Sequence, residues 1–226
     1  PYRANIAALK PAGVTDIVSI SACGSLKEQY VPGHFVAVDQ FIDRTVARES
    51  TFFGPGMVAH VSMARPVCSR LSALAAEAAE GAGVTLHRGG TYLAMEGPQF
   101  SSLAESQLYR QWGCDVIGMT AMPEAKLARE AELPYATLAM VTDYDCWREA
   151  EEAVNVTNVL EIMGRNSALA RRTVVELALR LAEIPRTPSP DGIDTCLDHA
   201  LITAPAARDP AMLEKLQVIA GRALDG

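Results

Sequence analysis

Two carboxylates flank a tyrosine in the stretch TDYDCW at 142–147, directly after the apolar run 136–141. Packing does not explain such a pair at the end of an expected strand, because aspartates are seldom buried without a partner. A carboxylate can accept hydrogen bonds from an amine, and a second acid beside it can raise its pKa until it holds a proton. Asp143 and Asp145 therefore raise the question of what they contact.

Small and polar residues also follow three other expected strands, in the segments 21–25, 96–101 and 118–120. Residues of this kind are common in turns, so each segment taken alone is more often an ordinary turn. In open α/β sheets, however, ligands collect beyond the carboxyl ends of strands. The joint placement of these segments with 142–145 favours a ligand site.

Several side chains admit both a structural and a functional interpretation. Ser21 and the small residues after it could cradle an anion, although the sequence has no Gly-rich dinucleotide fingerprint and no P-loop lysine. Phe100 could stack on a planar ring, but an aromatic residue after Gly-Pro is more often part of the core. Cys23 and Cys146 have no histidine near them in sequence, which favours small buried thiols over nucleophiles. His60 lies in an apolar setting and is more often a structural histidine than a ligand contact.

Apolar periodicity and chain breakers predict alternating strands and helices. The expected strands cover 16–22, 31–42, 91–95, 115–119 and 135–142. The expected helices cover 1–12, 66–81, 102–112, 123–132 and 157–183, with a last one starting near 209.

The order of these elements indicates the fold class. Strand 115–119, helix 123–132 and strand 135–142 have the β-α-β rhythm of a parallel sheet. Ser102 and Glu105 fit a capping box that opens the helix after 96–101. We expect one α/β domain over 1–226, with a central mixed, largely parallel β-sheet flanked by helices.

Charge and cysteine content narrow the classes of partner. The 226 residues are 49% hydrophobic and carry a net charge of −7 without a basic block, which argues against nucleic acid and anionic membranes. No apolar stretch approaches the roughly 20 residues that span a bilayer. The five scattered cysteines lack a C-x-x-C pair, so neither a disulfide framework nor a metal site is expected. A small-molecule partner and a cytoplasmic location are favoured.

The segments resemble a known family when they are taken together. The matching stretches are YRANIAALK (2–10), SACGSL (21–26), PGHFVAVDQFIDRT (32–45), MEGPQFSS (95–102), DVIGMT (115–120), PEAKLAREAELPYA (123–136), TDYDCW (142–147) and EEAVNV (151–156). They are similar to the trimeric branch of the purine nucleoside phosphorylase and methylthioadenosine phosphorylase family. The resemblance implies the nucleoside phosphorylase fold and a homotrimer or a dimer of trimers.

The resemblance also implies a reaction. Such an enzyme is a pentosyltransferase that uses inorganic phosphate as co-substrate, without a cofactor, to cleave methylthioadenosine into adenine and 5-methylthioribose 1-phosphate. It implies that Asp143 faces purine N7 and that Asp145 lies toward the 6-amino group. A carboxylate accepts from an amine and repels a carbonyl oxygen, so the pair favours adenine over hypoxanthine. Because the departing base gathers negative charge, Asp143 is expected to hold or share a proton.

The remaining site residues also come from the resemblance. Those implied to bind phosphate are Ser21 and Thr120. Those implied to bind the nucleoside are Ala22, Cys23, Gly24, Phe100, Ser101, Met119, Val156, Val159, Leu160 and His60. Phe100 would stack on the purine and Met119 would lie against the sugar. Val156, Val159 and Leu160 would form an apolar bed for the 5′-methylthio group, although the same residues would pack a helix anyway. His60 would come from a neighbouring subunit.

Two departures and three alternatives accompany this interpretation. The family's Gly-rich turn and Arg-His phosphate motif would precede Pro1, so the sequence is expected to lack that segment as it stands. Gln99 stands where many relatives have arginine. The alternatives are a hydrolytic nucleosidase, which would need a glutamate base; a phosphorylase of purine nucleosides or methylthioinosine with 6-oxopurine preference; and a non-catalytic nucleoside-binding subunit.

Overall fold

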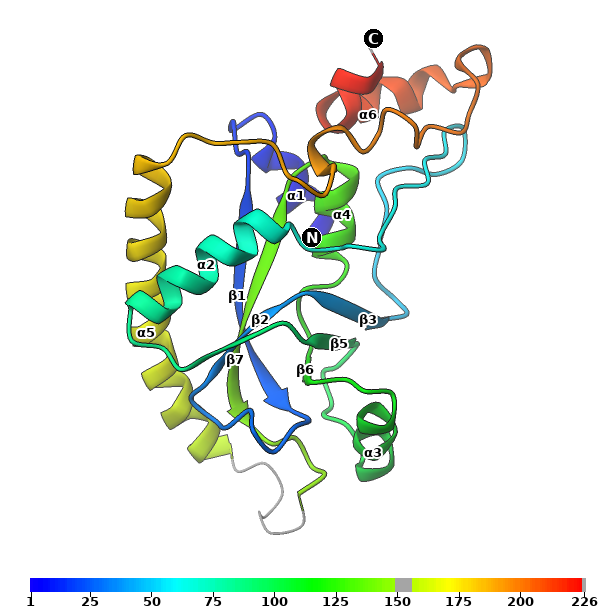
Figure 1. Ribbon diagram of the computed structural model, residues 1–226. Coiled ribbons are helices and arrows are strands. Elements are labelled where there is room, and N and C mark those ends of the chain that lie inside the picture. The colour runs from blue at the N-terminus through cyan, green and yellow to red at the C-terminus, as the bar shows by residue number, and fades with distance from the viewer. Residues whose placement is uncertain (149–155, 225–226) are drawn as a thin grey trace.

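A computed structural model describes residues 1–148 and 156–224 (Figure 1). The helices are α1 (Tyr2–Leu9), α2 (Ser69–Gly81), α3 (Leu103–Gln111), α4 (Glu124–Glu130), α5 (Val156–Glu183) and α6 (Pro210–Leu224), with 3₁₀ turns at Ile193–Thr195 and Pro205–Ala207. The strands are β1 (Ile17–Ser25), β2 (Phe35–Val38), β3 (Gln40–Arg44), β4 (Leu86–Arg88), β5 (Thr91–Met95), β6 (Val116–Gly118) and β7 (Tyr135–Asp143).

The strands form one 7-stranded mixed sheet in the order β3-β5-β6-β1-β7-β2-β4. Pairing is parallel for β3 with β5, β5 with β6, β1 with β7, and β2 with β4. It is antiparallel where β6 meets β1 and where β7 meets β2. The predicted mixed, largely parallel sheet flanked by helices is confirmed.

The antiparallel contact between β1 and β6 determines where the site lies. Only the last residues of β1 pair with β6, with Gly24 opposite Ile117 and Ser25 opposite Val116. The carboxyl ends of β1 and β7 therefore meet the carboxyl ends of β5 and β6, although the two sets of strands run in opposite directions. Segments that follow four different strands converge at this crossing (Figure 1).

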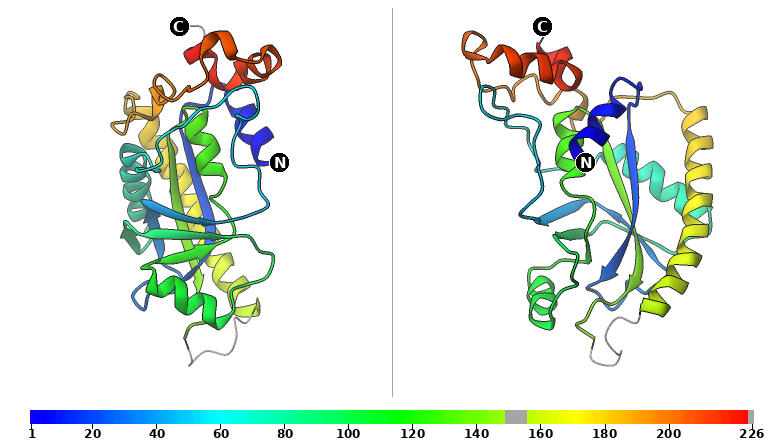
Figure 2. Two further views of the ribbon diagram at one scale, coloured as in Figure 1. Left: turned by 90° about the vertical axis from the view of Figure 1, so that its right-hand side faces the viewer. Right: turned by 180° about the vertical axis from the view of Figure 1, so that it is seen from behind.

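Helices cover both faces of the sheet (Figures 1 and 2). On one face, α2 and α5 pack on alternate side chains of β2 and β7, including Phe35, Leu138 and Met140. On the other face, the intervening residues of the same strands, such as Val36 and Val141, belong to an apolar core that α1, α4 and α6 also join. Helix α4 packs against β7 and α1 packs against α4, whereas α6 lies beyond the end of the sheet. Burial on both faces explains why the apolar run of β7 does not alternate with polar residues.

The capping box predicted at Ser102 is confirmed. The Ser102 hydroxyl accepts from the backbone N–H of Glu105 at 3.3 Å, and the Glu105 carboxylate accepts from the backbone N–H of Ser102 at 2.8 Å. Satisfying both N–H groups fixes the start of α3 immediately after the segment 96–101.

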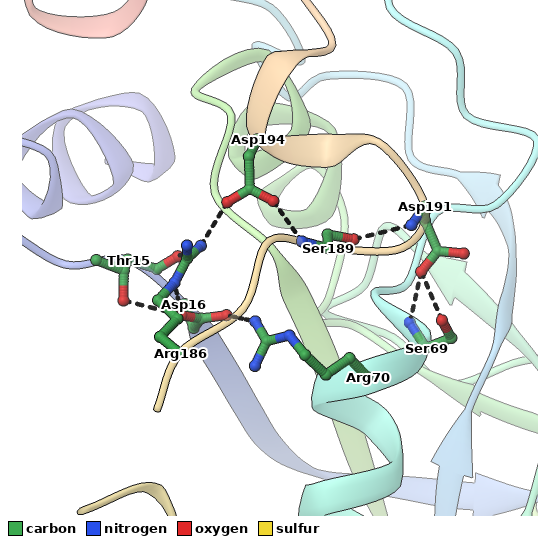
Figure 3. Close-up of polar contacts among 8 residues, drawn as sticks. All are labelled: Thr15, Asp16, Ser69, Arg70, Arg186, Ser189, Asp191 and Asp194. Atoms are coloured by element: carbon green, nitrogen blue, oxygen red, sulfur yellow. Dashed lines mark hydrogen bonds and ion pairs between the residues drawn. The ribbon is translucent and has the colours of Figure 1, made fainter. Parts of the chain in front are cut away.

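An ion network fastens the Pro-rich segment 184–195 to the start of β1 (Figure 3). Asp16 pairs with both Arg70 of α2 and Arg186, and Arg186 also pairs with Asp194 at 2.5 Å. Asp194 in turn accepts from the backbone N–H of Ser189 at 2.6 Å. The long connection after α5 is therefore held in place by these charged contacts together with the buried Ile193, which packs against Leu71 of α2 and Ala136 of β7.

Three sequence-based expectations are wrong. The single strand expected at 31–42 is two strands, because the chain leaves the neighbourhood of β7 at Asp39 and joins β5 at the other edge of the sheet. Strands β6 and β7 run in opposite directions with β1 between them, so they do not form the expected parallel unit. Helix α2 begins at Ser69 rather than at 66, and β4 was not predicted.

No described helix is both long enough and apolar enough to cross a bilayer.

Candidate active site

A cavity of about 310 Å³ lies at the crossing of the strand ends. Its lining comes from the ends of β1, β5, β6 and β7, the segments that follow them, and the first half of α5. The lining residues are Ala22, Cys23, Gly24, Met95, Phe100, Ile117, Gly118, Met119, Thr120, Thr142, Asp143, Asp145, Val159 and Met163.

The end of β1 is shaped to receive an aspartate from β7. The parallel register shifts between Cys23 and Gly24, so that Gly24 lies opposite Asp143. A Cβ atom at position 24 would lie 2.9 Å from Asp143 Oδ1 and 3.2 Å from the Ile117 side chain. Glycine is therefore required here for the carboxylate to reach the cavity.

The two aspartates are connected through a tight turn. Asp143 Oδ1 accepts from the backbone N–H of Asp145 at 2.8 Å, and Asp143 Oδ2 accepts from the Thr142 hydroxyl at 2.7 Å. Asp145 has a φ of 54°, a left-handed conformation that Asp tolerates better than most residues. The turn directs both carboxylates into one cavity.

Asp145 carries a perturbed carboxyl group. Burial raises its pKa, the nearby Ser106 hydroxyl opposes the shift, and the negative charge of Asp143 adds to it. Its Oδ2 atom is buried and accepts no hydrogen bond from any residue that the structure describes. The buried Ser106 hydroxyl likewise makes no hydrogen bond to the described residues, so it lies near this carboxyl group without satisfying it. A ligand in the cavity could supply the missing donor.

Hydroxyl groups line the β6 side of the cavity. The buried Tyr92 hydroxyl lies 3.1 Å from Thr120 Oγ1 and close to Ser21. Burial raises the pKa of Tyr92 to about 12, so the phenol stays protonated and can donate. A Cβ atom at Gly118 would lie 2.0 Å from that phenol oxygen, so the phenol lies directly behind Gly118, which lines the cavity. Ser21 Oγ is buried without a hydrogen bond to the described residues.

The two cysteines near the cavity are not activated. Burial and the charge of Asp143 raise the pKa of Cys23, and burial and the charge of Asp145 raise that of Cys146. Both shifts disfavour the thiolate. Cys23 is thus a buried thiol, whereas Cys146 is half-buried, and neither environment activates the sulfur.

The structure brings most of the predicted site residues together. Those that line the cavity are Ala22, Cys23, Gly24, Phe100, Met119, Thr120, Asp143, Asp145 and Val159. Phe100 is 62% exposed at its rim. Their predicted roles toward a ligand remain predictions.

Five predicted residues lie elsewhere. Leu160 is 65% exposed and faces away from the cavity, and Ser101 is buried with its hydroxyl toward Met95 Sδ. Ser21 lies behind the lining, next to Tyr92. The side chain of Val156 lies outside the described residues, although α5 begins there. His60 does not line this cavity; its segment lies beside α6, where its N–H donates to Ala200 O.

Sequence reasoning placed Gly118 and Thr142 in segments expected at the site without giving either a role, and it did not assign Met95, Ile117 or Met163 to the site. Met163 follows Val159 by four residues and so shares its helix face, a signal that could have found it. Asn166 anchors this part of α5 by donating to Val141 O of β7 at 2.9 Å. Ile117 lies within a short apolar strand, and nothing in its sequence context distinguishes it from a core residue.

Among the described residues that line the cavity, only Asp143 and Asp145 carry a formal charge. Over residues 1–148 and 156–224, no cluster of three or more His, Cys, Asp or Glu side chains could hold a metal ion. The cavity combines acids on the β7 side, hydroxyls on the β6 side and apolar side chains from α5. Such a lining fits a ligand with a basic or amine-bearing ring and a polar middle.

Comparisons with known proteins agree with this geometry. The sequence profile of the Phosphorylase superfamily matches residues 1–179. The S-methyl-5'-thioadenosine phosphorylase of Cereibacter sphaeroides is 62% identical over all of this chain and 78% of its own length. The enzyme of the same name from Bradyrhizobium diazoefficiens is 58% identical over all of this chain and 77% of its own length.

Solved structures show the same fold. A methylthioadenosine phosphorylase from an antarctic soil metagenomic library superposes with a TM-score of 0.90 at 45% identity, over 97% of this chain and 76% of that one. A methylthioadenosine phosphorylase from Schistosoma mansoni in complex with adenine gives a TM-score of 0.83 at 35% identity, over 89% of this chain and 77% of that one. On its profile match and these identities, the chain belongs to the phosphorylase superfamily.

Proposed function

We propose that this protein catalyses the phosphorolysis of S-methyl-5'-thioadenosine, giving adenine and 5-methylthioribose 1-phosphate. The relatives named above support the substrate, since they carry this activity in their names at up to 62% identity. The observation that carries the proposal is the buried Asp145 Oδ2 without a donor, beside Asp143 in the same cavity.

The carboxylate pair would select the base. A 6-aminopurine can donate its exocyclic N–H to Asp145, whereas a 6-oxopurine would present a second acceptor to an acceptor. Leaving two acceptors face to face in a buried site is costly, so adenine nucleosides are favoured. The raised pKa of Asp145 is consistent with an acid that has been removed from water before it meets its ligand.

Asp143 would assist the departure of the base. A phosphate oxygen forms a bond to C1′ while the C1′–N9 bond breaks, and the electron pair of that bond moves into the purine. A proton held by Asp143 then passes to N7 and neutralises the developing charge. The hydrogen bonds from Thr142 and the Asp145 backbone hold the carboxyl group in a fixed orientation for this transfer.

The rest of the nucleoside would occupy the other walls. Phe100 at the rim would stack on the purine, and Met119 would lie against the ribose. Thr120 and Ser21 would contact phosphate, with the Tyr92 hydroxyl between them. Val159 and Met163 would contact the 5′-methylthio group, with Met163 taking the place predicted for Leu160.

The assembly and cellular location belong to the proposal as well. A homotrimer or dimer of trimers would bring the exposed His60 to a neighbouring cavity. The five free thiols are in keeping with a cytoplasmic location.

The test is release of free base by the full-length protein from methylthioadenosine, methylthioinosine and inosine, each with and without phosphate. We expect adenine release that requires phosphate. Release without phosphate would show a hydrolase instead. Preference for the inosine compounds would overturn the role of the aspartate pair, and no release at all would favour a binding subunit.

A further inference from the structure

Arg48 lies behind the cavity wall in the segment that follows β3. Its side chain is only 10% exposed, although the segment itself crosses the surface. Arginine carries five N–H donors in a rigid plane, and a buried guanidinium needs partners for most of them. The position of these partners shows what Arg48 holds together.

The guanidinium binds backbone carbonyls from two separate segments. One terminal nitrogen donates to Met119 O at 2.8 Å and to Met122 O at 2.6 Å. The other donates to Glu96 O at 2.8 Å and more weakly to Met95 O at 3.4 Å. Arg48 Nε pairs with the Glu96 carboxylate at 3.2 Å. One side chain therefore fastens the chain after β5 to the chain after β6.

The ion pair is itself supported on the acidic side. The Glu96 carboxylate accepts from the backbone N–H of Val46 and of Ala47, which precede Arg48. These backbone hydrogen bonds lower the pKa of Glu96, so the carboxylate is ionised when it meets the guanidinium. The segment 46–48 and Glu96 thus hold each other in one geometry.

Both fastened segments supply walls of the cavity. Met95, Met119 and Thr120 line it directly. On the cavity side the segments touch, because a Cβ atom at Gly97 would lie 2.4 Å from Met119 Sδ. The segments are thus in contact on one side and bound to a single guanidinium on the other.

We propose that Arg48 is a positioning residue for phosphorolysis, which fixes Met119 and Thr120 at the sugar and phosphate end of the cavity. This inference rests on the proposed function. Arg48 makes no described contact with β7, which carries the acids proposed to bind the base. Of the groups proposed to bind the base, only Phe100 at the rim follows a fastened segment, so loss of Arg48 should weaken the use of phosphate far more than adenine binding.

The experiment compares R48A and R48K with R3A. Arg3 is a matched control, since it is an exposed arginine that pairs with Glu49 next to Arg48. For each full-length variant, kcat and the KM for phosphate are measured at saturating methylthioadenosine, and the Kd for adenine is measured by calorimetry. We expect R48A to lose about 100-fold in kcat/KM for phosphate, with the Kd for adenine within about threefold of wild type.

The conservative variant supplies the second readout. Lysine keeps the charge but cannot reach four carbonyls in one plane, so R48K should recover no more than about tenfold. Added methylguanidine should partly restore R48A, because it can fill the vacated space, and should leave R48K unchanged. If R48A does not fold, R48K carries the same prediction with about a tenfold loss.

Two results would overturn the inference. One is an R48A enzyme within about threefold of R3A in kcat/KM for phosphate. The other is loss of adenine affinity equal to the loss of kcat/KM, which would indicate general disruption of the fold. A wild-type protein that releases no base would instead overturn the proposed function, so the two failures are distinguishable.

Discussion

Acidic side chains lie at both ends of the β1–β7 strand pair, in opposite environments. At the start of β1, Asp16 is paired with Arg70 and Arg186, and the network of Figure 3 continues to Asp194. At the end of β7, Asp143 and Asp145 face a cavity on which no described lining residue is cationic. The same residue type is paired with arginines at one end and faces a cavity at the other.

The pKa shifts at the two ends have opposite directions. At Asp194, burial is outweighed by hydrogen bonds from Arg186 and Ser189, so the pKa is lowered. At Asp145, burial dominates and the charge of Asp143 reinforces it, so the pKa is raised. A carboxylate that stabilises the fold is thereby distinguished from one whose burial costs stability and which is proposed to bind a ligand.

The largest effect should come from the acids of the cavity. Asp143→Asn removes the proposed proton donor and should lower kcat/KM for methylthioadenosine by about 10²–10⁴-fold, as expected for loss of general acid catalysis. Asp145→Ala removes a charged hydrogen bond worth about 1.5–3 kcal/mol, or roughly 10–150-fold. The Asn variant at 143 should gain relative activity on 6-oxopurines. Steady-state kinetics on both nucleosides measures this, and unchanged preference in both variants would contradict the assignment.

A substitution at the start of β1 should change the free energy of unfolding and leave kcat unchanged. Asp16→Ala leaves two guanidinium groups without their shared acceptor and should cost about 1–3 kcal/mol in the free energy of unfolding. Urea denaturation gives this value. The activity per folded molecule should match wild type, and a drop in kcat at full folding would show that the two ends are coupled.

The pH dependence of stability sharpens the contrast. The stabilisation from Asp194 is present above its ordinary pKa of about 4 and is lost as pH falls through its lowered folded value. The penalty from Asp145 begins as pH rises above about 4 and is complete above its raised folded value. At pH 7, Asp194→Asn should therefore lower the free energy of unfolding by about 1 kcal/mol, and Asp145→Asn should raise it by about 1 kcal/mol. The Tm should shift in the same directions. Both differences should shrink as pH falls, the Asp145 difference first and the Asp194 difference last, because the folded pKa of Asp145 is raised and that of Asp194 is lowered. Scanning calorimetry over a pH series would reveal any other pattern.

The smallest effect should come from an uncharged group at the cavity. Tyr92→Phe removes only the hydroxyl that bonds to Thr120, so the KM for phosphate should rise about 2–10-fold, in line with about 0.5–1.5 kcal/mol for one hydrogen bond. Tyr135→Phe is the matched control, because that buried phenol bonds to Glu124, which does not line the cavity, whereas Thr120 does. Equal changes in both variants would remove the role given to Tyr92.

Local signals predicted much of the fold. The strand Thr91–Met95 was placed at its observed bounds, because apolar residues there lie between a glycine pair and the turn at Gly97. What failed depends on partners distant in sequence. Apolar residues stand on both sides of Asp39, in β2 and in β3. Nothing local shows that the two strands pair at different places in the sheet. The apolar run of β6 likewise carries no information on its direction.

The candidate site likewise contains residues that local sequence reveals and residues that only the packing of the fold reveals. The acids after β7 were found because charge at a strand end is conspicuous in sequence. Val159 and Leu160 are adjacent apolar residues of α5, yet Val159 lines the cavity and Leu160 is 65% exposed. The rotation of α5 about its axis decides between them, and that rotation depends on packing against β7. Arg48 has no signal at all, since a buried arginine looks like a surface one in sequence.

The meeting of oppositely directed strand ends has a consequence for how such a protein can change. The acids belong to the end of β7, whereas Gly118, Met119 and Thr120 belong to the end of β6, which enters the cavity from the other side. An insertion or substitution in one set of segments can alter its own wall without passing through the backbone of the other set. Under the proposed function, a change in base preference and a change in the contacts to ribose and phosphate are then separate evolutionary steps.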